Sequence, residues 1–325
     1  MSKFSDFGNA LYSGDKSFNF TGRRKLWYTI SAVVIAVSAI LPFTLHNGFN
    51  FGIEFKGGSE FTISGGASKG TDIARKALDL TLPGKEVVVS TIGTDTVRVQ
   101  TPQLSDTKSE QVRKELAKTY SVQSSAVSSS FIGASWGSDV TGKALNGLAW
   151  FLALAAVLMA IYFRTIKMSI AAMSALLHDL LITAGIYGSL GLEVTPAAVI
   201  GFLTILGYSL YDTVVVFDKI RENTVEVEHS ETATFSERVN LAINQTLVRS
   251  INTTVVAILP VAAILFIGAL VFGAGTLRDI SLALFIGMLV GTYSTIFVAA
   301  PLYSQLREKE PKFVEAASKV FAKRN

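Results

Sequence analysis

Residues 194–217 read VTPAAVIGFLTILGYSLYDTVVVF, an apolar run interrupted by a single charged side chain, that of Asp212. A helix needs about 20 apolar residues to cross the hydrocarbon core of a bilayer, so this run predicts a membrane span. A carboxylate within a span is costly and normally faces protein or water, which makes it a functional candidate. The stretch therefore predicts both the class of the protein and one residue of its site.

Five further runs of comparable length predict an α-helical polytopic membrane protein with six transmembrane helices. They cover residues 26–45, 144–163, 168–192, 250–277 and 280–306. The composition agrees, because half of the residues are hydrophobic and only 17% are charged. The first run is longer than the apolar core of a signal peptide, so we expect an uncleaved anchor. The chain has no cysteine and only three, widely separated histidines, so we expect neither a disulfide nor a metal site.

Lysine and arginine are concentrated on alternate sides of the predicted spans. They are frequent in the N-terminal segment 1–25, in the short connection after residue 163, in the loop 218–249 and in the tail 307–325. Positively charged loops tend to stay in the cytoplasm, so both termini are expected there and residues 46–143 outside. This distribution accounts for most of the basic residues outside the large loop, and nucleic acid is therefore not an expected partner.

Residues 46–143 form the one large hydrophilic segment and are expected to fold as a small domain. Apolar residues alternate with polar ones or glycine in some stretches and recur at helical spacing in others. The predicted elements are a strand over 51–63, a helix over 71–80, strands over 86–92 and 96–101 around a turn at 93–95, a helix over 105–120 and a strand over 122–132. The order βαββαβ predicts an α+β domain of ferredoxin-like type, a fold that names no function. Gly57 and Gly58 are interpreted as a turn or bulge.

Asp212 lies about 9 Å inside the charged end of its predicted helix, at 1.5 Å per residue. Tyr208, then Thr204 or Ile205, and Gly201 precede it on one helical face, and such a partly polar stripe can line a water path. The alternative is a structural hydrogen bond between packed helices, which small residues and one polar group also serve.

Arg249 begins the fifth predicted span and could lie at about the depth of Asp212. If the two side chains touch, the arginine keeps the carboxylate charged, and protonation of Asp212 would release Arg249 and couple proton movement to helix movement. The alternative is an ordinary cytoplasmic anchor, for which arginine is also the usual residue.

His178 and Asp179 lie near the middle of the third predicted span, where charge is most expensive. Either residue could belong to a proton relay, and a structural Asp179 bonded to a neighbouring hydroxyl is the alternative. Gly287 and Gly291 in the sixth span are four residues apart and are interpreted, with Gly201, as sites of close helix packing.

Four motifs extend these observations: FGIEFKGG at 51–58, LHDL at 177–180, GYSLYDTVVVFDKIREN at 207–223 and NQTLVRSINTT at 244–254. Together they resemble the SecF subunits of bacterial SecD/SecF protein-export complexes, members of the resistance-nodulation-division superfamily. The resemblance runs essentially end to end and implies that Asp212 and Arg249 are the proposed proton-path residues. Tyr211 stands where the family usually has asparagine, which changes the hydrogen bonding available beside Asp212.

The resemblance implies a transport accessory rather than an enzyme, with the proton as coupling ion and no other cofactor. The implied partners are a SecD-like subunit, the SecYEG channel and a translocating preprotein, within the lipid bilayer of the bacterial cytoplasmic membrane. The leading hypothesis is that the proton gradient promotes late preprotein translocation and release. Two alternatives stay open. One is an exporter of lipids or small hydrophobic compounds, which a large apolar pocket would favour. The other is a non-transporting scaffold of the translocon, whose buried charges serve assembly only.

Overall fold

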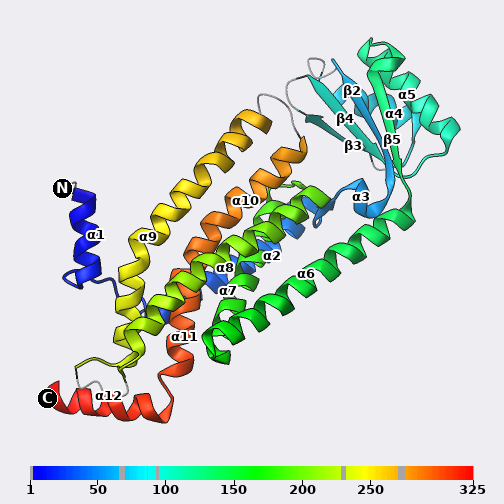
Figure 1. The fold of residues 1–325 in the computed structure, drawn as a ribbon. Coiled ribbons are helices and arrows are strands. Elements are labelled where there is room, and N and C mark those ends of the chain that lie inside the picture. The colour runs from blue at the N-terminus through cyan, green and yellow to red at the C-terminus, as the bar shows by residue number, and fades with distance from the viewer. Residues whose placement is uncertain are drawn as a thin grey trace.

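The protein is an elongated helical bundle with a small α/β domain at one end and both chain termini near the other (Figure 1). The computed structural model describes residues 3–65, 70–85, 87–92, 95–227, 232–269 and 275–324. Within these ranges six helices are long and apolar enough to cross a membrane, which confirms the number of spans predicted from hydropathy.

The six long helices account for most of the bundle, and two short helices flank it. The long ones are α2 (Arg24–His46), α6 (Ala134–Phe163), α7 (Ile166–Ser189), α8 (Pro196–Thr224), α9 (Phe235–Ala263, continued by the π-helical η4, Ile264–Ala269) and α10 (Gly275–Ser294, continued by the π-helical η5, Thr295–Ala299, and by α11, Ala300–Arg307). The short ones are α1 (Lys3–Ser13) and α12 (Pro311–Arg324), which lie at the end of the bundle far from the α/β domain (Figure 1).

Several helices extend well beyond the apolar runs that predicted them. Most of the predicted loop 218–249 is helical, because α8 continues to Thr224 and α9 already begins at Phe235. Thr234 caps α9 in a capping box with Glu237, which is why the helix starts in polar sequence. Hydropathy finds the apolar part of a helix and not its cap. Residues 228–231, and residues 270–274 of the predicted fifth span, lie outside the described ranges.

Small residues bring pairs of helices into close contact. A Cβ on Gly287 of α10 would lie 2.5 Å from Ile205 Cγ1 of α8, and one on Gly201 would lie 2.8 Å from the Cβ of Ala283. A Cβ on Gly185 of α7 would lie 2.5 Å from a backbone carbonyl oxygen of α2. Helix α6 runs along the side of the bundle (Figure 1), and little of its apolar stretch is buried.

The α/β domain, hereafter the sheet domain, has four antiparallel strands with two helices. The elements are β2 (Gly58–Ser64), α4 (Asp72–Thr81), β3 (Val88–Ile92), β4 (Thr96–Thr101), α5 (Asp106–Tyr120), the 3₁₀ turn η2 (Ser124–Ala126) and β5 (Val127–Ile132). The strand order is β3-β4-β2-β5. Phe61, Val99, Leu78, Leu116 and Tyr120 belong to one buried core shared by the sheet and both helices. Residues 86, 93 and 94 of the predicted hairpin lie outside the described ranges.

Two predicted strands are shorter than expected. The strand predicted over 51–63 is divided into β1 (Asn50–Phe51), a one-turn helix α3 (Ile53–Lys56) and β2. Gly57 and Gly58 turn the chain between α3 and β2 with φ values of 76° and 154°, which glycine adopts without strain. The strand predicted over 122–132 begins only at Val127, because η2 takes up the preceding residues. Four alternating residues fit one helical turn as well as a strand, so periodicity could not separate them.

One pairing was absent from the prediction. Strand β6 (Glu193–Val194), between α7 and α8, pairs in parallel with β1, with Asn50 opposite Glu193 and Phe51 opposite Val194. The short connection between the third and fourth spans is therefore bonded to the segment that leads into the sheet domain.

Candidate functional site

Asp212 lies on the buried side of α8, facing α9. Its side chain is 6% exposed, and its Oδ1 accepts a hydrogen bond of 3.0 Å from the hydroxyl of Ser250. Its Oδ2 is also buried and has no hydrogen-bond partner among the described residues. A buried carboxyl with one oxygen unbonded is unusual, because an unsatisfied buried polar atom costs about 1–3 kcal/mol.

The structure does not bring Arg249 into contact with Asp212. Arg249 is on the exposed side of α9, and no ion pair between the two is found in the part of the chain that the structure describes. Consecutive residues point about 100° apart on a helix, so Ser250 and Arg249 cannot both face α8 directly, and it is Ser250 that is buried there. The expected ion pair is therefore not formed among the described residues.

A row of hydroxyl groups continues from Asp212 towards the end of the bundle that carries the sheet domain. One turn along, Tyr208 of α8 donates a hydrogen bond of 3.4 Å to Thr254 of α9. The hydroxyls of Thr254 and Thr292 are 2.5 Å apart, which extends the row to α10. Three helices thus contribute polar groups on one side of α8.

The rest of the predicted stripe diverges from this row. The hydroxyl of Thr204 is exposed and donates to the carbonyl of Ile200 in its own helix, and Gly201 packs against α10 instead. Tyr211 is 58% exposed and points away from the helices of this chain. The residues of the predicted stripe therefore face different surroundings: Tyr208 lies next to α9, Gly201 packs on α10 and Thr204 is on the surface.

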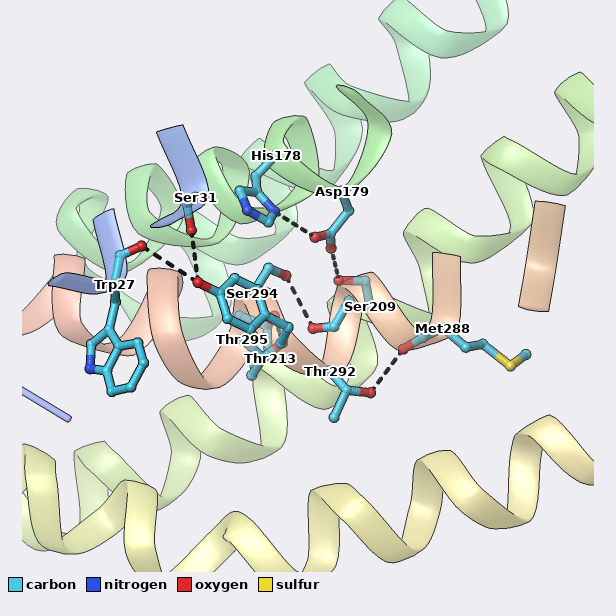
Figure 2. Close-up of polar contacts among 12 residues, drawn as sticks. Trp27, Ser31, His178, Asp179, Ser209, Thr213, Met288, Thr292, Ser294 and Thr295 are labelled. Atoms are coloured by element: carbon cyan, nitrogen blue, oxygen red, sulfur yellow. Dashed lines mark hydrogen bonds and ion pairs between the residues drawn. The ribbon is translucent and has the colours of Figure 1, made fainter. Parts of the chain in front are cut away.

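His178 and Asp179 form a second buried polar cluster with α8 (Figure 2). The hydroxyl of Ser209 donates to Asp179 Oδ2 at 2.5 Å, and His178 Nδ1 lies 3.2 Å from Asp179 Oδ1. Asp179 is fully buried, and both of its oxygens have partners. Nε2 of His178 is buried without a hydrogen-bond partner among the described residues, and its ring stacks on that of Tyr293. The hydrogen bond from Ser209 agrees with the alternative in which Asp179 is structural. A role of either residue in a proton relay remains a prediction.

Gly291 allows α10 to approach this cluster. A Cβ on Gly291 would lie 3.1 Å from Ser209 Oγ and 3.5 Å from Asp179 Oδ2. Sequence reasoning identified Asp179, Asp212 and the glycine but missed both serines. Ser209 precedes Asp212 by one helical turn and Ser250 follows Arg249, yet isolated serines are too common to stand out. Across the described ranges, His, Asp and Glu side chains form no group of three suited to a metal ion.

Comparisons with known proteins match nearly the whole chain. A family model described as "Protein export membrane protein SecD/SecF, C-terminal" matches residues 111–309, and a "SecD/SecF GG Motif" model matches residues 43–65. The protein translocase subunit SecF of Streptomyces coelicolor is 43% identical over 328 residues, covering 100% of this chain and 86% of the relative. The SecF of Mycobacterium tuberculosis strain H37Rv is 39% identical, covering 98% of this chain and 74% of the relative.

Solved structures of SecDF proteins resemble this chain over a part of their length. The crystal structure of SecDF from a Thermus species matches with a TM-score of 0.79 and 32% identity, covering 91% of this chain and 39% of that chain. A crystal structure of SecDF in a super-membrane-facing form matches with a TM-score of 0.61 and 31% identity, covering 94% of this chain and 40% of that chain.

Proposed function

This chain belongs to the SecD/SecF family of protein-export membrane proteins, and from that premise we propose that it uses the proton gradient to promote late preprotein translocation and release. The proposal rests on the environment of Asp212, whose buried carboxyl has one hydrogen-bond donor and one oxygen without a partner among the described residues. Such a group can accept a proton on Oδ2 without first breaking another contact. A charge that crosses 100 mV yields about 2.3 kcal/mol, enough to bias a helix between two arrangements.

In this proposal the protonation state of Asp212 determines how strongly α8 and α9 are held together. The charged carboxylate holds the Ser250 hydroxyl more strongly than the neutral acid does, because hydrogen bonds to ionised groups are about twice as strong. Proton uptake therefore loosens α9 from α8, and proton release restores the contact. The hydroxyl row through Tyr208 and Thr254 offers a polar route to Asp212 from the sheet-domain end.

We further propose that a SecD-like subunit covers the surface that carries Arg249 and Tyr211. Both side chains are exposed on helices that carry the candidate site. The relatives named SecDF join a second portion to the part that matches this chain, which supports a SecD-like partner. The SecYEG channel and the translocating preprotein are proposed on the family relationship alone.

We assign the sheet domain to the ferredoxin-like class and place it outside a bacterial cytoplasmic membrane, with both termini inside. The support for the class is the order β2-α4-β3-β4-α5-β5 with sheet order β3-β4-β2-β5. The support for the orientation is that the lysine-rich and arginine-rich segments lie at the end of the bundle opposite the sheet domain.

The test is gradient-dependent release of a preprotein from inverted membrane vesicles. We expect Asp212→Asn to abolish the gradient-dependent part of release while the complex with the SecD-like subunit is recovered in normal amounts. Asp218→Asn is the matched control, because it removes a charge near the polar end of the same helix and should leave release unchanged. Release by Asp212→Asn at the wild-type rate would refute the proposal. A parallel loss of complex and release would favour the scaffold alternative.

One observation favours the second candidate, an exporter of lipids or small hydrophobic compounds. A cavity of about 350 Å³ lies between α3, α6, α7 and α8, and its lining is almost wholly apolar; it includes Phe51, Phe55, Leu145, Leu148, Leu180 and Phe202. Movement of a labelled phospholipid between leaflets of vesicles that contain only this protein and its SecD-like partner would support this function. Filling the cavity with Leu148→Trp should then stop lipid movement, and it should spare release if protein export is the function.

A further inference from the structure

The two helices that carry the buried carboxylates are joined by the strand to which the sheet domain is attached. Helix α7 holds Asp179 and α8 holds Asp212, and β6 lies in the short connection between them. Because this connection is so short, β6 cannot move independently of both helices.

Side chains from strand β4 bind β6 directly. Arg98 forms an ion pair with Glu193, and Nε2 of Gln100 donates to Glu193 Oε1 at 2.7 Å. Gln100 also donates to Glu60 Oε2 of β2 at 3.1 Å. The Glu193 side chain is only 10% exposed, so these bonds are largely shielded from water. The carboxylate of Glu193 is thus held at both oxygens by the sheet domain.

The backbone reinforces this attachment. Besides the β1–β6 pairing, the N–H of Gly52 donates to the carbonyl of Val194 at 2.9 Å. A Cβ on Gly52 would clash with the carboxylate of Glu54 and lie 3.1 Å from Glu193 Oε1, so a larger residue here would have to displace these side chains. The segment that enters the sheet domain is therefore fixed to β6 before the first sheet strand begins.

A third helix is linked to the same turn. Thr195, next to β6, caps α8 by accepting from the N–H of Ala198 at 3.1 Å, and its hydroxyl donates to Asp279 of α10 at 2.8 Å. The ends of α7, α8 and α10 thus meet where the sheet domain is attached.

Removal of Arg98 would do more than delete one bond. Glu193, Glu60 and the half-buried Glu54 lie close enough to act on one another electrostatically, and Arg98 is a positive charge among them. A buried carboxylate that loses its partner is strongly disfavoured. The attachment should therefore depend on both members of the Arg98–Glu193 pair.

We propose that Glu193 is a positioning residue that fixes the sheet domain to β6, so that movements of α7 and α8 are passed to that domain through this contact. The inference rests on the proposed function for the source of the movement, proton binding at Asp212. It adds the route by which that movement leaves the bundle.

The first experiment measures this transmission. Because the chain has no cysteine, a single cysteine introduced at each labelling site can carry a spin label. The sites are the exposed Ser129 on β5 and Ile166 at the far end of α7, and the complex is made with a cysteine-free partner. We expect Asp212→Asn to shift the distance between the labels, and Arg98→Gln or Glu193→Gln to abolish that shift and to reduce gradient-dependent release. The charge swap, Arg98→Glu with Glu193→Arg, should restore part of both. Arg113→Gln is the control, because Arg113 pairs with Glu110 within the sheet domain.

The second experiment replaces the ion pair with a covalent link. In Arg98→Cys with Glu193→Cys, release should be low until a reversible bifunctional thiol reagent joins the two positions, and a reductant should reverse the recovery. A linked pair at positions 110 and 113 controls for the reagent. Inhibition by the link at 98 and 193 would overturn the proposal, because the contact would then have to open. Normal release from the unlinked protein would overturn it as well.

The two hypotheses fail in different ways. Wild-type release by Asp212→Asn refutes the proposed function. If Asp212→Asn is inactive while Glu193→Gln releases preprotein normally and keeps the distance shift, only the role of Glu193 is refuted.

Discussion

The hydroxyl of Ser250 donates a hydrogen bond of 3.0 Å to Asp212, whereas the adjacent Arg249 is exposed and forms no ion pair with that carboxyl among the described residues. The polar contact between α8 and α9 at this depth is thus made by a short neutral side chain. A neutral donor can remain in place whether or not the acid is charged, so the contact changes in strength and need not break.

We expect Ser250→Ala to lower the stability of the isolated chain by about 1–3 kcal/mol, because it leaves both oxygens of buried Asp212 without a described partner. The measurement is the melting temperature of the purified protein in detergent. Thr253→Ala is the control, since that hydroxyl bonds only to carbonyls of its own helix. Equal losses for the two variants would mean that the Ser250–Asp212 bond contributes little.

Arg249→Met should change the free energy of unfolding of the isolated chain by no more than about 0.5 kcal/mol, the range of ordinary surface substitutions, and should leave its melting temperature close to that of wild type. The same variant should weaken association with the SecD-like subunit, because it removes the exposed positive charge that the partner is proposed to bind. Co-purification at rising salt measures this association. A chain destabilised in the absence of its partner would show that Arg249 has an internal role.

Gly185→Ala should destabilise the bundle by about 1–3 kcal/mol, as is typical of overpacking. Its new Cβ would lie 2.5 Å from the carbonyl oxygen of Ser38, and a helix backbone cannot yield as a side chain can. Gly207→Ala on α8 is the matched control, because apart from the neighbouring backbone of its own helix no atom lies within 4 Å of the new methyl group. Similar melting temperatures for the two variants would contradict close packing of α2 on α7.

Glu54 should make stability depend on pH. Burial raises its pKa above the ordinary value of 4.5, the nearby Glu193 and Glu60 raise it further, and its own backbone N–H and Arg98 act in the opposite direction. The folded chain therefore holds this proton more tightly than the unfolded chain, so stability falls as pH rises from about 4.5 through the folded-state pKa.

We expect Glu54→Gln to flatten that fall and to raise the melting temperature at pH 7. Glu110→Gln is a control in which the pKa shift has the opposite direction, because the hydrogen bond from Arg113 lowers the pKa of Glu110. An unchanged pH profile in Glu54→Gln would show that this carboxyl does not titrate differently on folding.

Hydropathy predicts the six spans because each contains a long apolar run, and the cost of a charge within two of these runs identifies Asp212 and Asp179 without any structure. The direction of Arg249 was not predictable in this way. It depends on which side of α9 packs against α8, and one residue of helical phase turns a side chain by about 100°. Strand β6 was not predicted for another reason: two residues are too few to show a periodicity, and their pairing depends on a distant segment.

The parallel pairing of β1 with β6 constrains the order in which the protein can be made. Strand β1 follows the first span, whereas β6 follows the third, so their bonds cannot form until two more spans have been inserted. The ladder between β2 and β5 closes earlier, as soon as Ile132 is available. During synthesis the sheet domain can therefore fold before it is attached to β6. Its position on the bundle is fixed only once the third span has been inserted. A chain halted after α6 should thus carry a folded domain that is free to swing.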